Sequence, residues 1–312
     1  MSRCTLSYVA LAVTDVGAVA ETFERHLHLP RTDLTRDSGG PVPVFPVGAS
    51  ALALFAPDDP FLGEPAKPGV HHIALATEDA PGFARAAGFV AEDAGVTGLN
   101  DTRQLLLDPG ETLGVRIRLA EPFRLLRSAS EVVERIDHLG VACYDNSAAT
   151  GVFSGRLGFA VESTQTDMEV QMAVESFTSD KYGVVYHSRS PRPAGGLRVS
   201  FLTVGDCELE LLQPFDPNAT RAPEDGPPRD GPGNTGRDKG AIGRYIARRG
   251  PGLHHIALKT RDINGALSRL AAAALEVIDT VGRPGSRRAL IGFVHPRSLG
   301  GLLLHFVERD EL

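Results

Sequence analysis

Three histidines and one glutamate stand at isolated positions inside apolar, strand-like runs of the chain. They are His138, Glu210, His255 and His305. Side chains alternate between the two faces of a strand, so the apolar neighbours of each residue indicate which face packs against helices. Around His138, Leu139 and Val141 share one face, which leaves His138 on the other with Gly140 and Ala142.

The same alternation assigns a face to the residues of the other three strands. The residues predicted to pack against helices are Leu209, Leu211, His254, Ile256, Leu258, Leu302, Leu304 and Phe306. The opposite faces then carry Glu208 and Glu210 on one strand, His255 on the next and His305 on the last.

Three imidazoles and a carboxylate form a donor set that suits one divalent transition metal, such as Zn, Ni, Co, Mn or Fe. A single histidine in a strand is usually structural, but four residues assigned to inner faces by independent arguments favour a metal site. An octahedral ion would keep two positions open for oxygen atoms of a substrate. The chemistry expected there is Lewis-acid stabilisation of an enolate or a related oxyanion.

The elements that must position these residues form a repeat: an apolar strand, a short polar turn, an amphipathic helix and further strands. In the first helix, predicted over residues 16–27, Val19, Phe23 and Leu27 recur at four-residue spacing and define one buried face. The opening strands of the four copies are predicted at residues 6–13, 69–75, 136–142 and 252–258. Further helices are predicted near residues 82–87, 241–248 and 263–274.

The four copies predict an α+β fold of tandem βαβββ modules paired into two domains. We expect an N-terminal domain over residues 1–122, a linker over 123–134 and a C-terminal domain over 135–312. Two insertions near residues 163–196 and 215–240 interrupt the second half; the latter is rich in Pro, Gly, Asp and Arg, and is predicted to be a loop.

Several stretches of the second half carry a family resemblance. They are Asp137-His138-Leu139-Gly140-Val141-Ala142, Val204-Gly205-Asp206-Cys207-Glu208-Leu209-Glu210-Leu211-Leu212-Gln213-Pro214, and Phe293-Val294-His295-Pro296-Arg297-Ser298 with Gly300-Gly301. The chain resembles the vicinal oxygen chelate superfamily of glyoxalases, extradiol dioxygenases and methylmalonyl-CoA epimerases, and these stretches are most similar to the epimerases. The resemblance implies two vicinal-oxygen-chelate domains.

The resemblance also implies a metal, because the metal positions of the superfamily fall on His138, Glu210, His255 and His305. The chain departs from the family at His305, where epimerases, glyoxalases and iron dioxygenases typically carry a glutamate. This departure weakens the dioxygenase and glyoxalase interpretations, and it leaves the base for proton transfer open among Glu208, Glu210 and His305. Arg198 and Ser200 on the preceding strand are expected to line the substrate pocket.

The first half of the chain provides an internal comparison. The positions equivalent to the four predicted ligands hold Tyr8, Ala53, His72 and Arg118. Because Arg118 would repel a cation, we expect this half to lack a metal and to serve as a packing partner.

These features predict a metal-dependent epimerase or isomerase that moves a proton next to a substrate carbonyl through a metal-stabilised enolate or enediolate. Its substrate could be methylmalonyl-CoA or, given the extra domain, a sugar, a cyclitol or a natural-product intermediate. The alternatives are an Fe(II)-dependent dioxygenase and a metal-free protein that binds a small molecule, of the resistance type.

Composition limits the partners that the chain can have. The 312 residues are 42 % hydrophobic and 23 % charged, with a net charge of −7, which argues against nucleic acid as a partner. No apolar run approaches the ~20 residues of a membrane span. We expect a cytoplasmic protein with a small-molecule substrate and the capacity to form a homodimer.

Overall fold

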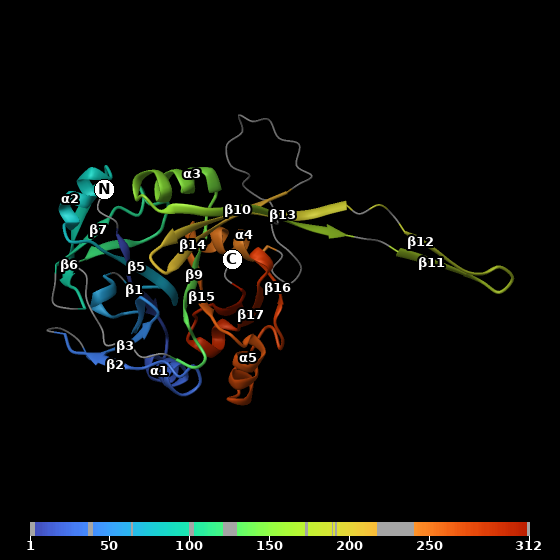
Figure 1. Cartoon of the computed structure of the whole chain (residues 1–312), viewed down its shortest axis with the longest axis horizontal. Coiled ribbons are helices and arrows are strands. Elements are labelled where there is room, and N and C mark those ends of the chain that lie inside the picture. The colour runs from blue at the N-terminus through green and yellow to red at the C-terminus, as the bar shows by residue number, and fades with distance from the viewer. Residues whose placement is uncertain are drawn as a thin grey trace.

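The computed structural model contains two eight-stranded curled sheets that have the same strand order (Figure 1). The residues that it describes are 4–36, 40–63, 65–99, 103–120, 130–171, 174–188, 190, 192–216 and 240–310. The tandem α+β architecture predicted from the four sequence copies is therefore confirmed.

The first sheet has the order β2-β3-β4-β1-β5-β8-β7-β6. Its strands are β1 (Thr5–Ala12), β2 (Thr32–Leu34), β3 (Val42–Val47), β4 (Ser50–Phe55), β5 (Gly69–Ala76), β6 (Ala91–Thr97), β7 (Arg103–Leu107) and β8 (Ile117–Ala120). The helical elements of this half are α1 (Val16–Arg25), the 3-10 turn η1 (Pro60–Leu62) and α2 (Ala80–Ala86).

The second sheet has the order β10-β13-β14-β9-β15-β18-β17-β16. Its strands are β9 (Arg135–Ala142), β10 (Ala160–Gln171), β13 (Arg192–Val204), β14 (Cys207–Phe215), β15 (Gly252–Lys259), β16 (Arg283–Pro284), β17 (Leu290–Val294) and β18 (Leu304–Glu308). The helical elements are α3 (Asn146–Thr150), the π-helical turn η2 (Gly151–Arg156), α4 (Ala241–Arg249), α5 (Ile263–Ala272) and the 3-10 turns η4 (Ser286–Arg288) and η5 (Pro296–Leu299).

An aspartate begins the helix that follows the opening strand of every copy. The side chains of Asp15, Asp79, Asp145 and Asp262 each accept a hydrogen bond from a backbone N–H of the first helical turn. Such an N-cap satisfies a donor that the helix itself leaves without a partner. The polar turn seen in each copy of the sequence therefore fixes where the chain leaves its strand and becomes helical.

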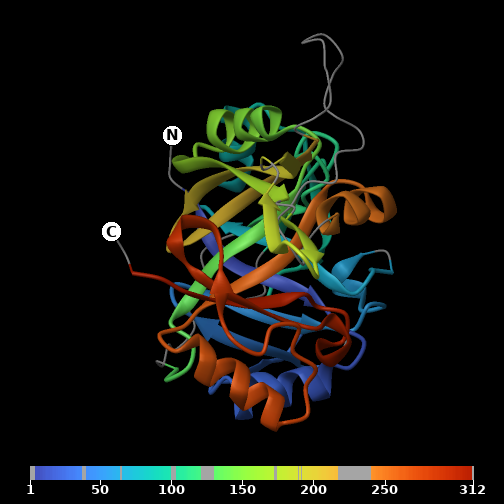
Figure 2. The same cartoon turned by 90° about the vertical axis from the view of Figure 1, so that its right-hand side faces the viewer.

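Helices from different halves of the chain lie side by side on the outer faces of the sheets. Figures 1 and 2 both place α1 beside α5, and the Arg269 side chain of α5 reaches the ring of His28 at 3.2 Å. At the other end of the molecule, the Arg156 guanidinium after α3 lies 3.6 Å from the ring centroid of Phe89 after α2. The first copy thus pairs with the fourth, and the second with the third. Among the described residues, no helix is both long and apolar enough to cross a membrane.

The predicted insertion over residues 163–196 extends the sheet. It lengthens β10 and β13, which pair from Ala160 with Thr203 to Gln171 with Arg192. Between them, β11 (Val174–Ser179) and β12 (Gly183–Ser188) form a separate two-stranded ribbon, which projects far from the body in Figure 1. Residues 217–239 of the second predicted insertion and residues 123–129 of the predicted linker lie outside the described residues.

Glycine at position 252 allows the loop before β8 to approach the start of β15 closely. Gly252 has φ +145°, and a Cβ built there would lie 2.9 Å from the backbone oxygen of Gly114. We expect Gly252→Ala to reduce the free energy of unfolding by about 1–3 kcal/mol, the usual cost of a residue held in a sparsely populated backbone conformation.

Urea unfolding of the full chain measures this change, with Gly155→Ala as the matched control. Gly155 lies in η2, and a Cβ built there has no atom within 4 Å. The control should therefore be neutral or stabilising, by up to about 1 kcal/mol. Equal effects of the two substitutions would contradict the close-approach argument.

Candidate metal centre

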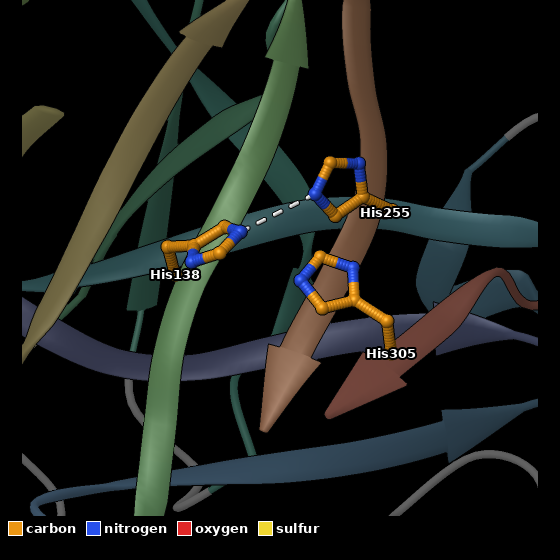
Figure 3. A group of neighbouring side chains, drawn as sticks. All are labelled: His138, His255 and His305. Carbon is orange, nitrogen blue, oxygen red and sulfur yellow. Dashed lines mark hydrogen bonds between the residues drawn. The ribbon is translucent and has the colours of Figure 1, made fainter. Parts of the chain in front are cut away.

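His138, His255 and His305 converge on the inner face of the second sheet from three neighbouring strands (Figure 3). One ring nitrogen of each lies within 4.8 Å of the corresponding nitrogens of the other two. All three side chains are buried, although each was predicted from an alternation pattern alone. The strand registers explain the convergence, because His255 lies opposite Gly140 and His305 lies opposite Ala257.

Glu210 reaches the same cluster from β14. One of its carboxylate oxygens lies 3.3 Å from Nε2 of His138 and 3.4 Å from Nε2 of His255. Burial alone would raise the pKa of Glu210, but the charges and hydrogen bonds of the two histidines hold it well below its usual range. The carboxylate is therefore ionised and contacts two of the three imidazoles.

Glycine at position 140 makes room for the cluster. A Cβ built on Gly140 would lie 2.1 Å from Cε1 of His255, a distance that no packing arrangement tolerates. Phe201 and Phe293 flank the rings, with centroids 5.9 Å from His138 and 4.4 Å from His305, respectively. The imidazoles are thus confined by packing as well as by their strands.

The carboxylates beside the cluster favour positive charge among the imidazoles. Burial disfavours the charged form of His138, yet Glu210 and Asp137 outweigh it and raise its pKa to about 9. Burial and the neighbouring histidines lower the pKa of His305 well below its usual range. Neither ring nitrogen of His305 has a hydrogen-bond partner among the described residues, an expensive arrangement unless a ligand occupies the site. The donor set therefore fits a divalent metal.

A cavity of about 590 Å³ opens onto the four predicted ligands. Its walls are largely apolar and include Leu197, Phe201, Ile242, Ile291 and Phe293. A concave apolar site with a few convergent polar groups is typical of small-molecule binding.

Asp167, on the extended part of β10, lines this cavity and was not identified from the sequence. Its carboxylate accepts hydrogen bonds from Ser286 at 3.1 Å and Gln165 at 2.6 Å. Burial raises its pKa above the usual range despite these hydrogen bonds. No sequence pattern indicated it, because β10 was interpreted as an insertion.

His254 does not lie on the helix-packed face to which alternation assigned it. The pairing of β15 with β9 passes from Leu253 directly to His255, so His254 forms a bulge. Its ring lines the cavity, hydrogen-bonds to His255 at 2.9 Å and contacts the ring of Tyr245 on α4. The predicted face of His254 was therefore wrong.

The expected pocket residues Arg198 and Ser200 lie on the opposite face of β13. The Ser200 hydroxyl donates to Asn146 of α3 at 2.5 Å, and the Arg198 guanidinium covers the ring of Phe215. The cavity is instead lined from this strand by Leu197 and Phe201. The expectation failed because the sequence did not show which face of β13 points inward.

Glu208, a candidate base, is held by cations. Its carboxylate lies 2.5 Å from a guanidinium nitrogen of Arg287 and 3.6 Å from one of Arg309. It is absent from the residues that line the cavity. These contacts make Glu208 part of an ion-pair network beside the site.

The first sheet holds Tyr8, Ala53, His72 and Arg118 at the equivalent registers. His72 and Ala53 both pair with Ala10, as His255 and Glu210 both pair with Gly140 in the second sheet. The Arg118 guanidinium donates to the carbonyl of Phe61 at 2.6 Å and lies 4.8 Å from the Phe61 ring centroid. Side chains of the protein therefore fill this concave face.

Comparisons with known proteins agree with this architecture. The family described as Glyoxalase/Bleomycin resistance protein/Dioxygenase superfamily matches residues 137–293, about half of the chain. The chain belongs to this superfamily. Its metal-centre half accounts for the match, which covers three of the four predicted ligands in sequence order.

Curated relatives match the same half. The mitochondrial methylmalonyl-CoA epimerase of Dictyostelium discoideum is 26 % identical over 115 residues, which are 36 % of this chain and 57 % of that protein. The uncharacterized protein YqjC of Bacillus subtilis is 23 % identical over 176 residues, 56 % of this chain and 93 % of that protein. This chain thus spans little more than half the length of the matched epimerase.

One solved structure resembles the whole chain. A mutant of 4-hydroxymandelate synthase from Streptomyces coelicolor superposes with a TM-score of 0.62 at 16 % identity, covering 99 % of this chain and 94 % of that chain. At this identity the likeness establishes the fold, namely the tandem arrangement of two vicinal-oxygen-chelate units.

We expect His138→Ala, His255→Ala and His305→Ala each to weaken zinc binding by more than the roughly 10- to 100-fold that loss of a ligand's hydrogen-bond partner costs in metal proteins. Isothermal titration of the metal-stripped full chain with zinc measures the affinity. His254→Ala is the comparison, because His254 hydrogen-bonds to His255 without joining the cluster, so its loss should cost only this smaller factor. An affinity unchanged in any of the three variants would remove that residue from the site.

Proposed function

We propose that this protein is a metal-dependent epimerase or isomerase that moves a proton next to a carbonyl group of a small-molecule substrate. The observation that carries the proposal is the cluster of three imidazoles and one carboxylate at the floor of an apolar cavity. Sequence similarity to methylmalonyl-CoA epimerases over this half supports the reaction class. We infer that His138, Glu210, His255 and His305 hold the metal, which is one of Zn, Ni, Co, Mn or Fe.

When bound, the metal supplies a Lewis acid that stabilises negative charge developing on a substrate oxygen. The protein's own residues must then orient the substrate, exclude water and move the proton. The apolar wall of Leu197, Phe201 and Phe293 would exclude water from the reacting carbon.

Among the carboxylates that line the cavity, we assign proton transfer to Asp167. Glu210 contacts two imidazoles, and Asp137 contacts His138 and arginine side chains. The Asp167 carboxylate instead accepts hydrogen bonds from the neutral side chains of Ser286 and Gln165. Burial raises the pKa of Asp167, which brings it closer to neutral pH than the pKa of an exposed carboxylate. A general acid and base works best when its pKa lies near the working pH. Glu208 is excluded from this role by its pairing with Arg287 and Arg309.

Proton exchange in deuterated water tests the reaction directly, with methylmalonyl-CoA as the first substrate and 2-substituted acyl thioesters and α-hydroxyketones as further probes. We expect the zinc-, cobalt- or nickel-loaded protein to incorporate deuterium at the substrate carbon next to the carbonyl. Proton NMR measures this exchange as the loss of the signal of that carbon's proton. Asp167→Asn should slow this exchange by about 10²–10⁴-fold, the usual contribution of a general base, while zinc affinity stays unchanged. If every substrate that the protein binds retains its proton, the proposed reaction is wrong.

A second candidate is an Fe(II)-dependent dioxygenase, which the whole-chain likeness to 4-hydroxymandelate synthase supports at the level of fold. The three imidazoles disfavour it, because a two-histidine, one-carboxylate iron site would carry a carboxylate where this chain has His305. Substrate-dependent oxygen consumption that requires Fe(II) would favour this candidate over the epimerase. A protein that purifies without metal and gains no affinity for zinc would instead indicate a small-molecule-binding role.

A further inference from the structure

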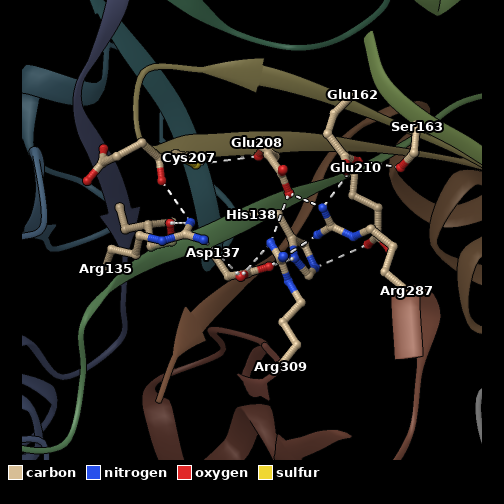
Figure 4. A network of polar contacts seen from close by, with 12 residues as sticks. Arg135, Asp137, His138, Glu162, Ser163, Cys207, Glu208, Glu210, Arg287 and Arg309 are labelled. Carbon is tan, nitrogen blue, oxygen red and sulfur yellow. Dashed lines mark hydrogen bonds and ion pairs between the residues drawn. The ribbon is translucent and has the colours of Figure 1, made fainter. Parts of the chain in front are cut away.

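We propose that Asp137, fixed by three arginines, is a positioning residue that orients His138 so that Nε2 of its ring faces the metal. This inference rests on the proposed metal site and extends it to a carboxylate that is not itself a ligand. Asp137 is fully buried, and its Oδ1 lies 2.8 Å from Nδ1 of His138 (Figure 4).

The direction of this hydrogen bond follows from the charge of Asp137. Its carboxylate lies 3.1 Å from a guanidinium nitrogen of Arg309, 3.4 Å from one of Arg287 and 3.7 Å from one of Arg135. An ionised carboxylate only accepts hydrogen bonds, so Nδ1 of His138 must carry a proton and donate it. With its Nδ1 proton held by Asp137, the ring can give up only the proton on Nε2, the nitrogen that faces Glu210 and His255, and a metal would take that proton's place.

The three arginines come from separate parts of the second half of the chain. Arg135 begins β9, Arg309 follows β18, and Arg287 lies in the turn before β17. Arg287 and Arg288 have φ of 56° and 57°, a conformation that non-glycine residues adopt rarely and that clusters at functional sites. This turn brings the Arg287 guanidinium against Asp137 and Glu208 and over the ring of Phe201 at 3.6 Å.

A bulge in β9 lets two adjacent residues serve one site. The pairing of β9 with β15 passes from His138 opposite Ala257 to Ile136 opposite Leu258, so Asp137 has no partner in the register. Adjacent side chains of a regular strand point to opposite faces, and a bulge relieves that restriction. Asp137 can therefore reach the ring of its own neighbour.

The first sheet has the same bulge without the carboxylate. Its register passes from Leu6 opposite Leu75 to Tyr8 opposite Ala74, which leaves Ser7 at the equivalent position. Tyr8 occupies the place of His138 there. The carboxylate thus accompanies the bulge in the half of the chain that carries the histidine cluster, which links Asp137 to the metal site rather than to the fold.

Zinc titration of metal-stripped Asp137→Asn tests the proposal, with Glu208→Gln as the matched control. Both substitutions remove one negative charge from contact with Arg287 and Arg309, but Glu208 contacts neither ring nitrogen of His138 in the described hydrogen bonds and ion pairs. We expect Asp137→Asn to weaken zinc binding by about 10- to 100-fold. Glu208→Gln should bind zinc as the wild type does. Equal affinities of the two variants would overturn the proposal.

A measurement on the wild type keeps the proposal testable if Asp137→Asn fails to fold. In the zinc-loaded protein labelled with ¹⁵N at histidine, long-range proton–nitrogen NMR should show His138 protonated at Nδ1 and coordinated through Nε2. Coordination through Nδ1 would overturn the positioning role. A wild type that binds no zinc would overturn this proposal and the metal-dependent function together, whereas zinc binding without deuterium exchange would overturn only the function.

Discussion

Burial of three histidines and one glutamate on one face of four adjacent strands is the constraint on which the rest of the structure depends. Two buried groups, Glu210 and His138, carry opposite charge and contact each other at 3.3 Å, while His305 retains two ring nitrogens without partners among the described residues. Burying such groups is expensive unless they are paired or bind a cation. The strands, the flanking phenylalanines and the space at Gly140 all serve to hold this arrangement.

Side chains of alternating charge surround that cluster and pair with one another. His138 contacts Asp137, and Asp137 and Glu208 in turn contact Arg287 and Arg309. Each buried charge therefore meets an opposite one, and the outermost layer belongs to segments that follow β18 or precede β17. The C-terminal strand, the last turn and the opening strand of this half depend on one another through this network.

The sequence predicted the cluster well because alternation is reliable where apolar residues mark one face. His138, Glu210, His255 and His305 lie in regular pairing, so their faces could be assigned from Leu139, Leu211, Ile256 and Phe306. His254 and Asp137 lie in bulges, where side chains do not alternate regularly between the two faces. His254 was therefore placed on the wrong face, and Asp137 was not identified. Arg287 depends on a left-handed turn and Asp167 on the extension of β10, and neither has a local sequence signal. The prediction that Arg198 and Ser200 line the pocket was wrong because β13 is buried on both faces near its centre, so the sequence does not show which face points into the cavity.

The X-ray absorption spectrum of the zinc-loaded protein at the zinc K-edge tests most directly whether the three histidines bind one metal ion. We expect a first shell of nitrogen and oxygen at about 2.0–2.2 Å, with the outer-shell scattering of three imidazole rings. A shell that contains sulfur at about 2.3 Å, or one with a single imidazole or none, would contradict it. Such a result would show that the three histidines converge without sharing an ion.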